Sequence, residues 1–172
     1  MGMKKHRQFG AICVLVLMMI STKAYCAYNA LEIDIALQLS SFFNNAPNQV
    51  RRYCLMREDY EHLQMQEIEN ITKNIKPQLT IKIVDDNLDQ NECWSVYIDN
   101  SSIYKLEKLA KSKAFQSSII VANGEFSLNY GADIAIYKVG NHYDIGVNTR
   151  TLTMKGIKVH PQLLEIAKLV KE

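Results

Sequence analysis

The sequence predicts a single α/β domain with a mixed β-sheet flanked by helices, a C-terminal β-hairpin and a terminal helix. Short apolar runs of strand character alternate along the chain with amphipathic segments of helical period, which is the pattern of helices packed on a sheet. The 172 residues are 48% apolar and 22% charged, with only 7 Gly and 3 Pro. That composition is ordinary for a globular protein, and the length suits one domain.

Residues 1–26 are predicted to be a signal peptide, with cleavage between about residues 24 and 27. Lys4, Lys5 and Arg7 precede the run Phe9–Ile20, which contains no charge. A membrane-spanning helix needs about 20 apolar residues, so a retained anchor is the weaker alternative. Lipidation of Cys26 is a further alternative, although the usual Leu-small-small run does not precede it. Residues 27–172 are therefore expected to form one exported domain.

The charge of the exported domain argues against a nucleic-acid partner. Removing residues 1–26 takes away four of the 20 basic residues and none of the 18 acidic ones, which leaves a net charge of −2. Nucleic-acid binding needs Lys and Arg clustered on one face. No such cluster is evident, and no nucleic-acid partner is expected.

Two cysteines, Cys54 and Cys93, remain in the body of the exported domain. In an oxidising compartment such a pair favours a disulfide over a metal site or a catalytic thiol. Each lies at an apolar run of strand character, so two neighbouring strands would bring them together. The alternative is a pair of reduced thiols in the core.

Residues 31–39 fit two patterns. Apolar residues alternate with others as in a half-buried strand, whereas Leu31, Ile35 and Leu39 also follow helical spacing, and Asn29 is a suitable helix cap. Periodicity alone leaves this choice open.

The remaining elements follow from residue type and spacing. Strands are expected where apolar residues are β-branched or alternate with polar ones, at Tyr53–Met56, Leu79–Val84, Cys93–Ile98 and Ser118–Ala122, and in a hairpin of Ala132–Val139 and Tyr143–Asn148. Three helices are expected. The first is Glu58–Asn74, and the second has an inward face of Ile103, Leu106, Leu109 and Ala110. The last starts at Pro161 and has one side made of Leu163, Leu164, Ala167 and Val170.

Catalytic and metal-binding motifs are scarce, and no catalytic residue, cofactor or metal is predicted. Residues 85–89 begin like a calcium loop, but Gln90 stands where the loop needs Gly. His62, His142 and His160 have no spacing that suggests a metal site. The one indication of a ligand is Asn123–Glu125, at the carboxyl end of a predicted strand, where open α/β sheets often bind small molecules.

Three segments of the C-terminal third form a recognisable pattern, together with the strands that carry Cys54 and Cys93; they are Gly131–Tyr137, Tyr143–Asn148 and Met154–Ala167. In this pattern the chain resembles the YfiR-like family of periplasmic proteins. The resemblance extends over roughly residues 29–171 and implies that residues 31–43 are helical. One departure is Gly146, which stands where the family commonly has Glu.

The resemblance implies a periplasmic regulator and not an enzyme. Members bind the periplasmic domain of an inner-membrane diguanylate cyclase and hold it inactive, which lowers cyclic di-GMP and biofilm formation. The resemblance also implies titration by an outer-membrane lipoprotein, and dimer formation by members. Apolar residues of the terminal hairpin and the segment after it are the candidates for partner binding, although alternation is expected to send about half of them into the core. They are Tyr143, Ile145, Val147, Leu152, Met154 and Ile157.

Two other function classes stay open. A periplasmic sensor could bind a small ligand near Asn123 and Gly124 and signal to another membrane receptor such as a histidine kinase. An exported enzyme of unrecognised type would instead need a cluster of titratable residues in a pocket.

Overall fold

The computed structural model describes residues 31–39, 42–43, 51–57, 79–85, 93–99 and 103–169. The predicted signal peptide, the predicted helix Glu58–Asn74 and His62 lie outside these residues. No helix in the described ranges has the length and apolar character needed to cross a bilayer.

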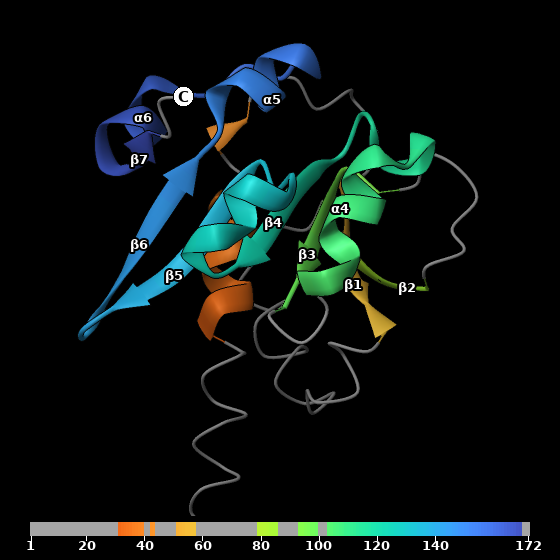
Figure 1. Ribbon diagram of the computed structural model, residues 1–172, viewed down its shortest axis with the longest axis horizontal. Coiled ribbons are helices and arrows are strands. Elements are labelled where there is room, and N and C mark those ends of the chain that lie inside the picture. The colour runs from red at the N-terminus through yellow and green to blue at the C-terminus, as the bar shows by residue number, and fades with distance from the viewer. Residues whose placement is uncertain are drawn as a thin grey trace, which may run out of the picture.

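Seven strands of the described chain form one mixed sheet in the order β2-β1-β3-β4-β5-β6-β7. Neighbouring strands are parallel except for β5 and β6, which form an antiparallel hairpin. The strands are β1 (Arg51–Met56), β2 (Leu79–Val84), β3 (Ser95–Ile98), β4 (Ile119–Asn123), β5 (Ile134–Val139), β6 (His142–Val147) and β7 (Lys168–Leu169). The predicted mixed α/β fold is confirmed, including the hairpin (Figure 1).

Both faces of the sheet are covered, so β3 and most of β4 and β5 are buried. Alternate residues of β4 illustrate this: Ile119 and Val121 belong to one core, and Ile120 and Ala122 to the other. Successive side chains of a strand point to opposite faces, and a strand covered on both sides therefore needs no polar alternation. This explains the short β-branched run of β4.

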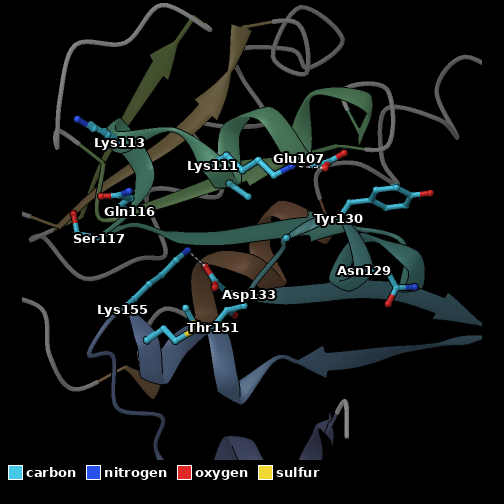
Figure 2. A pocket seen from close by; sticks show the side chains of 13 residues that line it. Glu107, Lys111, Lys113, Gln116, Ser117, Asn129, Tyr130, Asp133, Thr151 and Lys155 are labelled. Atoms are coloured by element: carbon cyan, nitrogen blue, oxygen red, sulfur yellow. Dashed lines mark hydrogen bonds and ion pairs between the residues drawn. The ribbon is translucent and has the colours of Figure 1, made fainter. Parts of the chain in front are cut away.

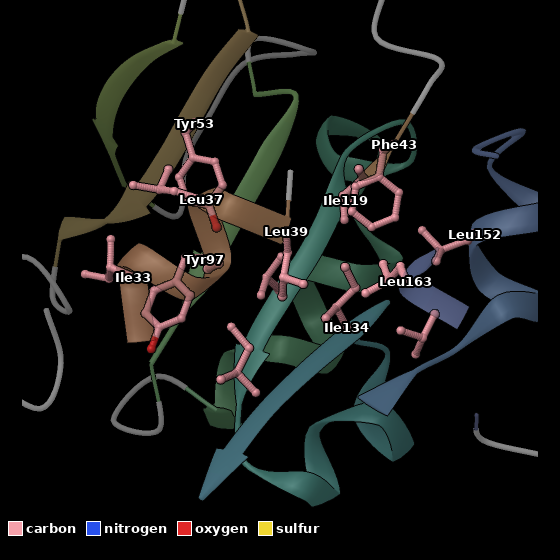
Figure 3. Close-up of a cluster of buried hydrophobic side chains, with 14 of the residues drawn as sticks. Ile33, Leu37, Leu39, Phe43, Tyr53, Tyr97, Ile119, Ile134, Leu152 and Leu163 are labelled. Carbon is pink, nitrogen blue, oxygen red and sulfur yellow. The ribbon is translucent and has the colours of Figure 1, made fainter. Parts of the chain in front are cut away.

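The first core lies under an α-helix of residues 31–39. Ile33, Leu37 and Leu39 of this helix pack on Tyr53 and Tyr97 of the sheet (Figure 3). The helix expected over residues 31–43 is therefore confirmed for residues 31–39. It does not extend to residue 43, because Phe43 forms a β-bridge with Val159. Burial in the folded protein decides between the strand pattern and the helix pattern of this segment. As a helix, the segment packs Ile33, Leu37 and Leu39 on the sheet and leaves Leu31 half exposed.

The second core lies under α4 (Ile103–Lys111), η3 (Lys113–Phe115) and η4 (Glu125–Tyr130). Leu106 and Leu109 of α4 are buried there, as the helical spacing predicts. The disulfide between Cys54 and Cys93 lies in the same core, with a Cα–Cα distance of 5.7 Å. The predicted pairing is present in the structure because β1 and β3 are adjacent strands.

The C-terminal region differs from the expectation in two ways. A short helix, α5 (Thr149–Met154), follows β6 and was not predicted; the Asn148 side chain caps it by accepting from Thr151 N at 3.1 Å. The last helix, α6 (Pro161–Ile166), is shorter than expected. Ala167 has an extended backbone, and Lys168 then pairs with Gly146 in the sheet, because pairing as β7 satisfies backbone groups that a longer helix would have used.

The two ends of the described chain are joined beside α6. Phe43 forms a β-bridge with Val159, and His160 N donates to Phe42 O at 2.8 Å. The helix of residues 31–39 and the segment that follows α5 therefore share one core, which includes Leu152 and Leu163.

Candidate functional site

The six residues predicted to bind a partner do not form one exposed surface. Val147 and Leu152 are fully buried beside Ile134 and Leu163, so these two belong to the half that alternation was expected to send into the core. Val147 alternates inward along β6, and Leu152 lies on the inner side of α5. Both side chains serve the core.

The other four candidates divide into two groups. Tyr143, Ile145 and Ile157 are partly buried and pack against the same core. Met154, the last residue of α5, has 79% of its surface exposed. Met154 is therefore the candidate with a side chain available to a partner.

The predicted ligand crevice at the carboxyl end of β4 is occupied by the protein itself. Asn123 Nδ2 donates to Glu32 Oε2 at 2.6 Å and to Asp99 Oδ1 at 3.2 Å, and Tyr97 OH donates to the same Glu32 oxygen at 3.0 Å. Glu32 is fully buried. Burial, together with the nearby Glu32 carboxylate, raises the pKa of Tyr97 well above its usual value. Helix 31–39 therefore uses this edge as a structural attachment.

His142, His160 and Asp85 each contact other protein groups in the structure. His142 Nε2 lies 3.4 Å from Asp144 Oδ1 at the surface, and His160 caps α6 by accepting from Gln162 N. Asp85 pairs with Arg57, and the rest of the segment 86–89 lies outside the described residues. In the described ranges, no three His, Cys, Asp or Glu side chains are placed to hold a metal ion.

A cavity of about 860 Å³ lies between α4, η4 and α5 (Figure 2). Its size is typical of small-molecule sites in proteins. Side chains from segments far apart in the sequence line it, and the labelled ones include Glu107, Lys111, Lys113, Gln116, Ser117, Asn129, Tyr130, Asp133, Thr151 and Lys155.

An ion pair between Asp133 and Lys155 lies in the wall of this cavity. Lys155 Nζ lies 2.5 Å from Asp133 Oδ2 and also donates to Ser118 O at 2.9 Å. The same Asp133 oxygen accepts from Ile120 N at 2.8 Å. Asp133 is fully buried, and the Lys155 side chain is 13% exposed. These bonds connect the end of α5 to the start of β4 and to the residue that precedes β5.

Large apolar side chains border the cavity. Tyr130 of η4 is 51% exposed, and Met154 of α5 is the other exposed apolar residue of the lining. The end of η4 packs closely on α4. A Cβ added to Gly131 would lie only 2.5 Å from Ala110 Cβ. The backbone of Gly131 has φ +104°, which favours glycine.

Sequence reasoning missed this cavity and its ion pair. Asp133 stands inside an otherwise apolar run, which is a signal for a buried charge that needs a partner. Nothing in the sequence connects it to Lys155, because the pairing depends on how α5 returns to the sheet.

The departure at Gly146 has a local physical reason. A Cβ there would lie 2.7 Å from Leu128 Cδ1, so η4 occupies the space beside β6. The acidic residue that is common at this position in the resembling family has no room unless Leu128 moves.

Comparison with known proteins identifies the family. A crystal structure described as the ABC domain in complex with L-Trp from Streptococcus pneumonia aligns with a TM-score of 0.57 at 13% identity, over 78% of this chain and 60% of that chain. At this identity it supports the α/β fold alone, and the chain spans less than two thirds of that structure. No curated protein matches the chain.

The family model described as YfiR/HmsC-like matches residues 31–168. This range takes in nearly all of the described sheet and helices, and the chain belongs to the YfiR/HmsC-like family.

Proposed function

We propose that this protein is a periplasmic regulatory binding protein that represses a membrane-bound diguanylate cyclase, and so lowers cyclic di-GMP and biofilm formation. The observation that carries the proposal is the family match over residues 31–168. Export by residues 1–26 is part of the proposal, as are titration by an outer-membrane lipoprotein and formation of a homodimer.

Repression of this kind needs binding alone. A domain that binds the inactive conformation of the cyclase more tightly than the active one shifts the population toward the inactive form. The size of the shift is set by the ratio of the two affinities, and a ligand with equal affinity for both states shifts nothing. The protein therefore needs a surface that distinguishes two receptor states.

We assign that role to a surface formed by Met154 of α5 and Tyr130 of η4, called here the α5–η4 surface. Both side chains are large, apolar and at least half exposed, and both border the same cavity. Exposed apolar patches are typical of protein-binding sites, and we propose that these two side chains contribute to one. Met is also suited to such contacts, because its flexible thioether adapts to the partner.

The first experiment measures intracellular cyclic di-GMP in the host after deletion of the gene and after its restoration. Deletion is expected to raise cyclic di-GMP, and restoration of the exported protein is expected to reverse the rise. An unchanged level, with the restored protein folded and exported, would refute the proposed function.

A second experiment tests the surface. Met154→Glu places a charge on the α5–η4 surface, and the restored variant is expected to leave cyclic di-GMP as high as the deletion does. Tyr104→Glu is the matched control, because Tyr104 is 70% exposed on α4 and does not line the cavity. Full repression by Met154→Glu would move the binding surface elsewhere while leaving the regulatory role intact.

A further inference from the structure

We propose that the cavity between α4, η4 and α5 binds a small organic carboxylate that has an apolar body. The proposal is independent of the proposed regulatory role, because it concerns binding to the purified domain. It stands on the charge, the available donors and the apolar surface of the cavity lining.

The lining has an excess of positive charge. Three lysines and two carboxylates face the cavity. Lys155 pairs with Asp133, and Lys111 pairs with Glu107 at 2.6 Å, so each carboxylate is already matched by one lysine. Lys113 is the third lysine, and it leaves the lining with one net positive charge, which suits a monoanion.

The nearly buried Lys155 supplies a specific donor. An ammonium group has three N–H donors, and within the described residues Lys155 uses two of them, on Asp133 Oδ2 and Ser118 O. The third is available to an acceptor in the cavity. Because Lys155 is held by these two bonds, it is already positioned and loses little side-chain freedom when an anion binds.

The cavity also offers apolar contact. Ala110, Tyr130 and Met154 line it, and the last two expose much of their surface. An aromatic or aliphatic body that contacts this apolar lining would remove part of its surface from water, and the Met154 sulfur makes favourable contacts with aromatic rings. A bare inorganic anion would use the lysines but not these groups.

Phenylacetate is the probe, because it combines a carboxylate with an apolar ring. Phenylacetamide keeps the shape without the charge, and acetate keeps the charge without the ring. Binding is followed by shifts of the backbone amide signals of the purified domain in NMR titrations. Since the fragment is small, a dissociation constant of about 1 mM is expected.

The expected result is a saturable set of shifts for phenylacetate at lining residues such as Ala110, Gly131 and Thr151, with much smaller shifts for the other two compounds. Met154→Glu is expected to weaken phenylacetate binding about tenfold by placing a negative charge at the cavity. Ile166→Glu is the control, since Ile166 is 63% exposed on α6 and outside the lining. Its affinity should equal that of the wild type.

Three outcomes would overturn the proposal. If phenylacetate gives no saturable shifts, the cavity does not bind such a carboxylate. If acetate binds equally well, the apolar lining does not contribute to affinity. If phenylacetamide binds equally well, the charge of the ligand is not recognised. None of these outcomes bears on cyclic di-GMP, so the proposal and the proposed function fail separately.

Discussion

Lys155 Nζ lies 2.5 Å from Asp133 Oδ2, and the two side chains connect the end of α5 to the residue that precedes β5. Asp133 is fully buried, and its carboxylate also accepts from Ile120 N of β4. A charge this deep in the protein is tolerated only when it is paired and hydrogen-bonded. The pair therefore fixes the position of α5 relative to the sheet.

Replacing Lys155 with Met is expected to destabilise the protein by about 3–5 kcal/mol, because the Asp133 carboxylate would stay buried without its cation. Urea unfolding of the purified domain measures the change. Lys111→Met is the matched control: it breaks an exposed ion pair with Glu107 and is expected to have little effect. Equal stability of Lys155→Met and the wild type would contradict this account of the pair.

Gly131→Ala is expected to destabilise the protein strongly, by about 2 kcal/mol or more. The new Cβ would meet Ala110 Cβ at 2.5 Å, and alanine is strained at φ +104°. Gly140→Ala separates the two effects, since Gly140 has φ +61° but no atom within 4 Å of the added Cβ. It should cost about 1 kcal/mol, the backbone strain alone. If the two variants unfold at the same urea concentration, α4 and η4 do not pack as closely as described.

Removal of the disulfide by Cys54→Ala together with Cys93→Ala is expected to lower the free energy of unfolding by about 4 kcal/mol. The sequence separation of 39 residues closes a long loop, which restricts the unfolded chain. Urea unfolding with and without a reducing agent measures this. The reductant should destabilise the wild type and leave the double variant unchanged. A non-reducing mass that corresponds to two free thiols in the exported protein would show that the bond does not form.

The ion pair between Asp144 and Lys168 is expected to make stability depend on pH. The hydrogen bond from Lys168 Nζ, at 2.6 Å, lowers the pKa of Asp144 below its usual value. Since the folded-state pKa is the lower one, the stabilisation is complete above the unfolded-state pKa of about 3.9 and is lost as pH falls through the folded-state value.

Melting temperatures of the wild type and Asp144→Asn, measured across pH, test this expectation. The wild type should be the more stable at neutral pH, and the two curves should converge in acid. A constant difference between the curves down to the lowest pH would show that Asp144 stabilises β6 and β7 without its charge.

Local patterns in the sequence were sufficient for most of the sheet. The runs at Leu79–Val84 and Ser118–Ala122 predict strands, and the structure has β2 and β4 there within one residue at each end. Short β-branched runs have few alternatives, because a helix of that length would bury too little apolar surface. The spacing of Leu106 and Leu109 likewise predicted α4 and its buried side.

Short C-terminal elements were harder to predict from local patterns. A helix of six residues such as α5 depends on its Asn148 cap and on the burial of Leu152, and neither is evident from periodicity. The end of α6 depends on β6, which offers Lys168 a strand partner. Both outcomes are set by neighbours in space and not by neighbours in sequence.

The sequence by itself determined the mixed α/β class, the candidate cysteine pair and the resemblance to the YfiR-like family, because composition, period and motif are local properties of the chain. Only the tertiary structure decided that Val147 and Leu152 are core residues, that Glu32 closes the edge beside Asn123, and that Asp133 and Lys155 meet in the wall of a cavity. Burial and pairing of charges join residues that are far apart in the sequence, and their distances are set only when the sheet and the helices on both its faces have packed together.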